Sequence, residues 1–180
     1  EGATPLGLLP GDKIMEREEL SWRDVEALLD HMLPQIAGRF DVILIITRGG
    51  IIPGGIMAES LDISDVLIAA VEFPKDSELG QLAWPTFMQF PSDTLFRSQR
   101  VLIVDDVWNS GRTINTVRGR VEAAGGNAKT CVLHYKPSAS RFRDKEPDYY
   151  GAITNRWVIY PWEVDRGPDF ASRKTEMVLS

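Results

Sequence analysis

The sequence predicts a single α/β domain, with a parallel β-sheet flanked by helices on both faces and a small hood. Short apolar runs that end in glycine-rich or acidic turns are typical of buried parallel strands. Segments with apolar residues at helical spacing lie between these runs, and strands that alternate with helices favour a parallel sheet. We expect the core over about residues 20–135 and the hood over about 136–180, to which N-terminal residues can contribute.

The composition is that of a globular protein without a membrane or nucleic-acid partner. The chain has 180 residues, 43% of them hydrophobic, and a net charge of −6. No run approaches the roughly 20 apolar residues of a membrane span, and a nucleic-acid binder usually shows a basic face. No secretory signal is visible at the start, and the one cysteine, Cys131, lies in an apolar run that predicts a buried, reduced thiol. Together these features predict a cytoplasmic protein.

The first half of the predicted elements runs as follows. Ser21 is placed to cap a helix whose apolar residues recur from Trp22 to Leu33, and Pro34 and Gly38 close or kink it. The run 41–47 is the first strand, Pro53 starts the next helix, and 66–73 is the second strand. Residues 1–10 form an irregular lead-in.

The second half begins with a long connection. Residues 74–97 have no clean period and contain three prolines, which favours a functional flap that closes over the site. The third strand covers 100–107, and a helix follows that ends at Gly125-Gly126. Further strands are predicted at 128–135 and 152–160.

The segment 101–113, VLIVDDVWNSGRT, carries most of the chemistry. Its apolar strand delivers Asp105 and Asp106 to the carboxyl end of the sheet, where ligands bind in such folds. The turn from Asn109 to Gly111 then opens a helix, whose N-terminal N–H groups suit a phosphate dianion. Because carboxylates repel a nearby phosphate, they must have other partners, such as sugar hydroxyls or a divalent cation. The alternative is that the two acids only cap an ordinary turn.

This array resembles the signature of the type I phosphoribosyltransferase family. In that family the acidic pair contacts the ribose 2′ and 3′ hydroxyls of phosphoribosyl pyrophosphate, and the loop holds its 5′-phosphate. The resemblance implies Asp105, Asp106 and Asn109 as candidate catalytic residues. It also implies Mg²⁺ as the cofactor, which Asp105 and Asp106 would hold indirectly through ribose hydroxyls or water. The residues implied at the phosphate are Ser110, Gly111, Arg112 and Thr113.

A second loop, Thr47 to Gly54, looks like the pyrophosphate loop of the same family. It follows a strand directly, its glycines free backbone N–H groups, and Arg48 supplies positive charge. The resemblance therefore implies that Arg48 and Gly49 receive pyrophosphate. In family members this loop often contains a cis peptide bond between non-proline residues. A plain turn between a strand and a helix is the alternative for this segment alone.

The base site rests on a resemblance to bacterial xanthine-guanine phosphoribosyltransferases, carried by HYKP (134–137) and RWVIYPWE (156–163). It implies that Lys136 donates to the purine 6-oxo group, Trp157 stacks on the ring and backbone groups near Val158 read the other edge. A cation suits a carbonyl oxygen and an indole suits a flat heterocycle. Core packing is the alternative for Trp157, and we assign Trp162 to structure.

The implied activity is transfer of a phosphoribosyl group to xanthine, guanine or hypoxanthine in purine salvage. One position departs from the family: purine members usually carry Asp where this chain has Asn109, preceded by the unusual Trp108. An amide cannot accept a proton as a carboxylate does. Two alternatives therefore stay open: a phosphoribosyltransferase for another base, such as a pyrimidine, and a non-catalytic sensor of phosphoribosyl pyrophosphate or nucleotide. By analogy with the family we expect a homodimer or homotetramer. His31 and His134 are assigned neither metal nor acid–base roles.

Overall fold

The computed structural model describes residues 16–73 and 85–163. The chain divides into two compact units, a larger one of residues 22–155 and a smaller one of residues 1–21 and 156–180. The sequence predictions for residues 1–10, for the first part of the flap and for the end of the hood lie outside the described residues.

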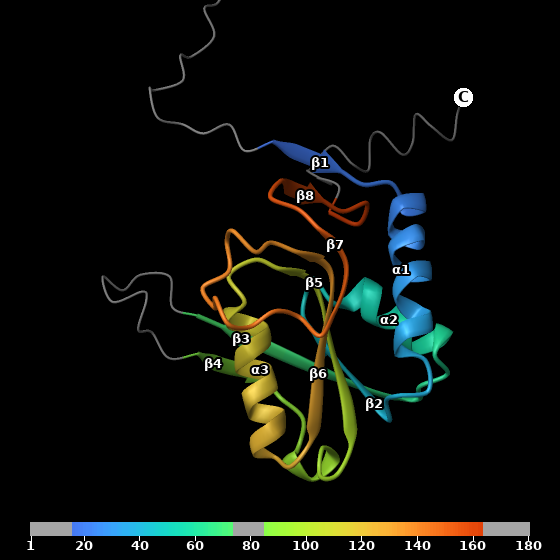
Figure 1. The fold of residues 1–180 in the computed structure, drawn as a ribbon. Coiled ribbons are helices and arrows are strands. Elements are labelled where there is room, and N and C mark those ends of the chain that lie inside the picture. The colour runs from blue at the N-terminus through green and yellow to red at the C-terminus, as the bar shows by residue number, and fades with distance from the viewer. Residues whose placement is uncertain (1–15, 74–84, 164–180) are drawn as a thin grey trace, which may run out of the picture. The chain divides into compact units, whose positions relative to one another are not determined.

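A six-stranded sheet forms the larger unit (Figure 1), in the order β4-β3-β2-β5-β6-β7. Neighbouring strands are parallel except for the edge pair β3–β4, which is antiparallel. In chain order the elements are α1 (Trp22–Ile36), β2 (Val42–Ile46), α2 (Ile51–Ser60), β3 (Asp65–Glu72), β4 (Thr86–Gln89), the 3₁₀ turn η1 (Asp93–Leu95), β5 (Arg100–Trp108), α3 (Arg112–Ala123), β6 (Asn127–Tyr135) and β7 (Tyr149–Ile153).

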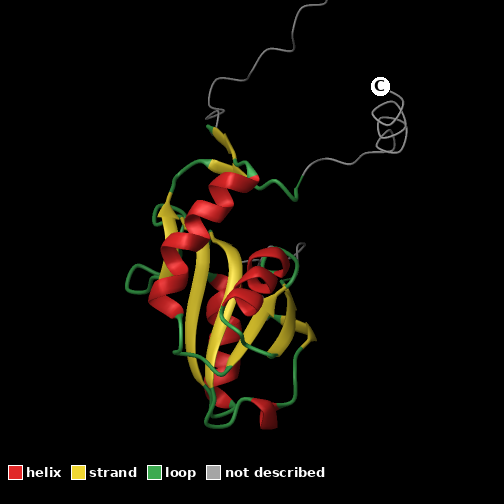
Figure 2. Ribbon diagram, turned by 90° about the vertical axis from the view of Figure 1, so that its right-hand side faces the viewer, coloured by secondary structure: helices red, strands yellow, loops and turns green. Residues whose placement is uncertain are grey.

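Helices cover both faces of this sheet, as the alternation in the sequence predicts (Figure 2). Successive side chains of a strand point to opposite faces, and both sets are buried in β2 and in the first part of β5. On one face, Leu44 and Ile103 belong to a core cluster with Val117 of α3. On the other face, Ile45 contacts Gly54 of α2, and Cys131 is buried 3.9 Å from the sulfur of Met57.

The register aligns the carboxyl ends of the central strands. Ile45 of β2 pairs with Val104 of β5, and Trp108 at the end of β5 pairs with Tyr135 at the end of β6. The loops that follow these three strands therefore leave the same edge of the sheet, which is where ligands bind in α/β folds.

Three predicted elements differ in the structure. The run 152–160 is not one strand: β7 joins the main sheet and β8 (Trp157–Ile159) pairs elsewhere, because the chain leaves the sheet between them. Helix α2 begins at Ile51 rather than Pro53, since a proline in the first turn forfeits no helical hydrogen bond. Part of the connection 74–97 forms regular structure, because β4 pairs antiparallel with β3 at the edge of the sheet.

The smaller unit contains a two-stranded parallel sheet of β1 (Arg17–Glu19) and β8. The Trp157 N–H donates to the Glu16 carbonyl at 2.8 Å, and Leu20 N–H donates to the Ile159 carbonyl at 2.9 Å. The Tyr160 and Trp162 rings stack with centroids 4.7 Å apart. Trp162 thus has a packing contact, in keeping with the structural role that the sequence suggests.

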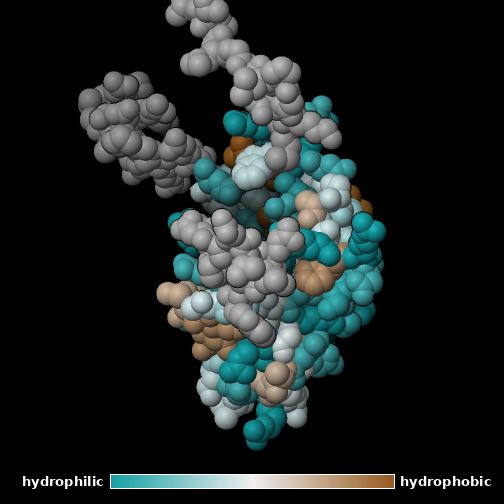
Figure 3. Space-filling view, turned by 90° about the vertical axis from the view of Figure 1, so that its left-hand side faces the viewer, coloured by the Kyte–Doolittle hydropathy of each residue, from teal (hydrophilic) through white to brown (hydrophobic). Residues whose placement is uncertain are grey.

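No helix within the described ranges is both long and apolar enough to cross a membrane. On the face that Figure 3 shows, hydrophilic residues predominate and the visible apolar residues form separate groups. The homodimer or homotetramer stays a prediction.

Candidate active site

The acidic pair lies in the last part of β5, where the strand changes from buried apolar residues to half-buried polar ones. The Asp106 N–H donates to Oδ1 of Asp105 at 2.9 Å. Burial, and after it the negative charge of Asp106, raises the pKa of Asp105 well above its ordinary value. Two carboxylates held this close favour a cation or hydroxyl donors as their partners.

The turn after β5 forms the N-terminus of α3, as the sequence predicts. Gly111 is the N-cap residue with φ +76°, a left-handed conformation that glycine adopts without steric cost. A Cβ at this position would lie 2.6 Å from Cε2 of Trp108. Ser110 Oγ accepts the Arg112 N–H at 3.3 Å, and the Gly111 carbonyl accepts Nδ2 of Asn115 at 2.8 Å. The result is a fixed helix start that suits an anion.

The loop after β2 contacts the acidic pair directly. The peptide bond between Thr47 and Arg48 is cis, a point that the sequence left open. A Cβ on Gly49 would lie 2.5 Å from Oδ2 of Asp106, and one on Gly50 would lie 2.7 Å from the Ile46 carbonyl oxygen. Only glycine therefore allows the loop to approach the carboxylate this closely, and the two predicted motifs meet at this contact.

Lys136 lies beside the same edge, directly after β6. Its N–H donates to the Trp108 carbonyl at 3.0 Å, and the residue is only 8% exposed. Burial lowers the pKa of the Lys136 ammonium. His134 is buried near the end of β6, whereas His31 is exposed on α1.

The other candidate residues are placed as follows. Arg48 and Asn109 are exposed, and Thr113 is half-buried in the first turn of α3. The Arg112 guanidinium lies 4.1 Å from the centroid of the Phe73 ring, at the end of β3, a contact that no sequence pattern indicates.

Trp157 and Val158 belong to β8 of the smaller unit, whereas the residues described so far in this section belong to the larger unit. The Trp157 side chain is 52% exposed and Val158 is buried. Their contacts with a base stay a prediction.

The donor set near β5 fits Mg²⁺. Two adjacent carboxylates offer hard oxygen ligands, and Mg²⁺ is usually held by one or two carboxylates together with substrate phosphates and water. In residues 16–73 and 85–163, no group of three or more His, Cys, Asp or Glu residues is placed to hold a metal ion. That Asp105 and Asp106 would hold Mg²⁺, indirectly through ribose hydroxyls or water, stays a prediction.

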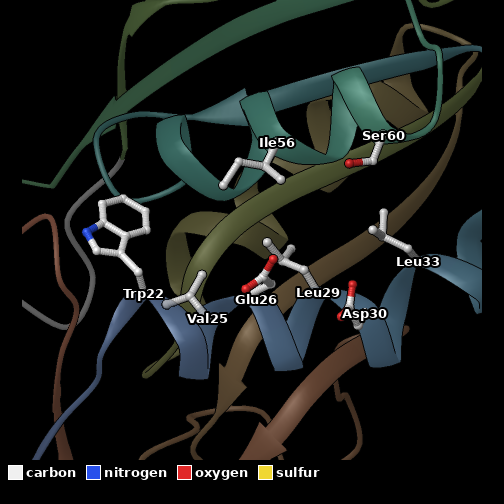
Figure 4. Close-up of a pocket in the computed structure, with 8 residues that line it drawn as sticks. All are labelled: Trp22, Val25, Glu26, Leu29, Asp30, Leu33, Ile56 and Ser60. Atoms are coloured by element: carbon white, nitrogen blue, oxygen red, sulfur yellow. The ribbon is translucent and has the colours of Figure 1, made fainter.

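A cavity of about 370 Å³ lies away from these motifs, between α1 and α2 (Figure 4). Side chains of both helices point into it, among them Leu29 from α1 and Ile56 from α2. None of the candidate residues lines this cavity. It is lined by Trp22, Val25, Glu26, Leu29, Asp30, Leu33, Ile56 and Ser60.

Comparison with known proteins gives a consistent result. The phosphoribosyl transferase domain model matches residues 14–166. The xanthine-guanine phosphoribosyltransferase of Roseobacter denitrificans is 28% identical over 152 residues, covering 81% of this chain and 77% of that protein. The enzyme of the same name from Cereibacter sphaeroides is 29% identical over 147 residues, covering 81% and 78%. The crystal structure of a purine phosphoribosyltransferase from Pyrococcus horikoshii superposes with a TM-score of 0.71 and 29% identity, covering 83% of this chain and 95% of that one.

Proposed function

Because this chain belongs to the phosphoribosyl transferase domain family, we propose that it transfers the phosphoribosyl group of phosphoribosyl pyrophosphate to a 6-oxopurine. Xanthine, guanine or hypoxanthine would give the nucleoside 5′-monophosphate and pyrophosphate, a reaction of purine salvage. The contact of Gly49 with the Asp106 carboxylate carries this proposal. It brings the loop that we propose for pyrophosphate next to the acidic pair that we propose for the sugar, and a pyrophosphate leaving group on ribose needs both at one place.

Each part of the sugar phosphate has a matching group in the chain. The carboxylates of Asp105 and Asp106 accept hydrogen bonds from the ribose 2′ and 3′ hydroxyls and so orient the sugar. The backbone N–H groups of residues 110–113, together with the side-chain hydroxyls of Ser110 and Thr113, hold the 5′-phosphate at the start of α3. Arg48 and the backbone of Gly49 receive the departing pyrophosphate.

Mg²⁺, when bound, neutralises charge on the pyrophosphate and so makes it a better leaving group. Asp105 and Asp106 are its proposed partners, through ribose hydroxyls or water. Burial raises the pKa of Asp105, and a bound cation or ribose hydroxyls would favour the ionised form that burial opposes.

The purine selectivity rests on Lys136, Trp157 and Val158. Lys136 is buried directly after β6, so its ammonium is a poorly hydrated donor that suits the 6-oxo oxygen. Trp157 would stack on the ring, and backbone groups at Val158 would read its other edge. The names of the relatives support a 6-oxopurine over a pyrimidine.

One position favours a second candidate function. Asn109 is exposed beside the phosphate loop and cannot act as a general base, whose help is typically worth about 10²–10⁴ in rate. A protein that binds phosphoribosyl pyrophosphate or nucleotide without transfer would tolerate this residue. Transfer remains the better supported function because leaving-group departure depends mainly on positioning and Mg²⁺.

The test is product formation with Mg²⁺, phosphoribosyl pyrophosphate and, separately, hypoxanthine, guanine, xanthine, adenine and uracil. Nucleotide from at least one 6-oxopurine is the expected result, and the variant with Asp105→Asn and Asp106→Asn should form none while it keeps the wild-type circular dichroism. Binding of phosphoribosyl pyrophosphate without product from any base would favour the sensor. Product from uracil alone would favour the pyrimidine alternative.

A further inference from the structure

Trp108 is the residue of the motif segment for which the family pattern gives no role. It is the last residue of β5 and only 1% exposed, and it has the largest side chain among the fully buried ones of the described residues. Its ring packs edge-on against Tyr135 with centroids 6.0 Å apart. A buried indole needs a partner for its N–H, and the identity of that partner shows what the residue does.

The partner is the hydroxyl of Ser140, in the turn that follows Lys136. The indole N–H of Trp108 donates to Ser140 Oγ at 3.1 Å. The same oxygen accepts the Phe142 N–H at 3.2 Å and donates to the Phe142 carbonyl at 3.0 Å. A hydroxyl has one donor and two acceptor positions, so these three contacts use all of them. The indole therefore completes the hydrogen bonding of the Ser140 hydroxyl in this turn.

Two main-chain contacts join the same segments. The Lys136 N–H donates to the Trp108 carbonyl at 3.0 Å, and the Arg141 N–H donates to the Ser110 carbonyl at 3.0 Å. The Ser140 N–H returns to the Lys136 carbonyl at 3.2 Å. Residues 108–111 and 136–142 are thus held together at three points, of which the Trp108–Ser140 contact alone depends on side chains.

The same edge of the indole also faces the phosphate loop. A Cβ on Gly111 would lie 2.6 Å from Cε2 and 2.9 Å from Cζ2 of Trp108, so the Gly111 backbone lies against the indole edge that carries the N–H. One rigid ring thereby touches the proposed phosphate loop and the turn that carries Lys136.

We propose that Trp108 is a positioning residue that sets Lys136 relative to the phosphate loop, and so fixes the span between the 5′-phosphate and the purine 6-oxo group. This inference rests on the proposed function, because it assigns those two ligand groups to Gly111 and Lys136. The indole acts through the turn and touches no reacting atom.

The variants Trp108→Phe and Ser140→Ala test this role. Phe keeps an aromatic ring but removes the N–H, and Ala removes its acceptor without changing the ring. Loss of one neutral hydrogen bond changes an equilibrium by about twofold to tenfold. We expect KM for the base to rise by about that factor or more in each variant, while kcat changes by less than about twofold. KM for phosphoribosyl pyrophosphate should stay within about twofold in Ser140→Ala, which leaves the indole against Gly111. Trp22→Phe is the matched control, because Trp22 lies on α1 at the separate cavity (Figure 4).

The double variant Trp108→Phe with Ser140→Ala sharpens the test. Both single changes remove the same Trp108–Ser140 hydrogen bond, and each also removes contacts of its own. The effect of the pair on KM for the base should therefore be smaller than the product of the two single effects. Effects that multiply would overturn the proposal. So would an unchanged KM for the base in both single variants, even if both unfold at a lower temperature, since that result indicates packing alone.

Amide hydrogen exchange separates this inference from the proposed function. Peptides covering 136–142 should exchange faster in Trp108→Phe and Ser140→Ala than in the wild type and in Trp22→Phe. A wild-type protein that forms no nucleotide, combined with this faster exchange, would refute the proposed function and support the role of Trp108 in holding the turn. Unchanged exchange would overturn that role whether or not the wild type is active.

Discussion

Gly111→Ala is the substitution for which the structure makes the most specific prediction. Gly111 combines a left-handed backbone with a direct contact to the Trp108 indole. Substitutions at two other glycines distinguish the cost of the left-handed backbone from the cost of the contact with Trp108. Gly38 has φ +70° with nothing within 4 Å of a built Cβ, and Gly119 lies within α3 with open space around it.

The magnitudes follow from these environments. A left-handed conformation costs a residue with a Cβ about 1–2 kcal/mol, and forcing atoms into packed space typically costs about 1–3 kcal/mol more. Gly111→Ala should therefore lower the free energy of unfolding by about 2–5 kcal/mol. Gly38→Ala should lower it by about 1–2 kcal/mol, and Gly119→Ala should raise it by about 1 kcal/mol through helix propensity.

Thermal unfolding and ligand titration are the two assays. For a chain of this size, 1 kcal/mol shifts the unfolding temperature by about 2–4 °C, so the three variants should differ clearly and in the stated order. Titration with phosphoribosyl pyrophosphate and Mg²⁺ should show weakened binding for Gly111→Ala only, because only that change displaces the proposed phosphate loop.

Two results would refute this reasoning. If Gly111→Ala unfolds at the same temperature as Gly38→Ala, the contact with Trp108 has no energetic consequence. If it is destabilised but binds phosphoribosyl pyrophosphate like the wild type, residues 110–113 are not the phosphate site.

Three further changes test individual residues. At pH values above the raised pKa of Asp105, Asp105→Asn should raise the unfolding temperature of the ligand-free protein, because it removes a buried carboxylate beside Asp106. Its advantage over the wild type should shrink as the pH falls and Asp105 is protonated, so an advantage that grows in acid would contradict this account. Lys136→Gln should raise KM for the base about tenfold or more, since hydrogen bonds to charged groups are the stronger ones. In the wild type, KM for the base should increase as the pH rises, at pH values below those at which an ordinary lysine loses its proton, because burial lowers the pKa of Lys136. A KM that does not change with pH in either protein would show that Lys136 is not part of the base site. Asn109→Asp should raise kcat, because it supplies a general base, and a lower kcat would show that the amide is not limiting.

The sequence predicts the central strands and the site loops well because each is a local pattern. Val42 to Ile46 and Val101 to Val104 are continuous apolar runs, and such runs are buried in a parallel sheet wherever they pair. The change from apolar to acidic at Asp105, and the glycine at the start of α3, also involve only neighbours in the chain. The run from Ala152 to Tyr160 was predicted wrongly as one strand, because residues with strand propensity do not reveal where the chain leaves a sheet.

What the sequence determined by itself was the family, the order of the main strands and helices, and the positions of the acidic pair and the two loops at strand ends; their roles in binding stay predictions. The tertiary structure decided which of these groups meet. Gly49 reaches Asp106 because β2 and β5 pair in parallel register, and Trp108 reaches Ser140 because β6 returns beside β5. Such contacts join residues far apart in the chain. The alternation of side chains along a strand is the same whichever strand it pairs with, so the sequence pattern does not identify the partner. Only the folded arrangement selects the partner.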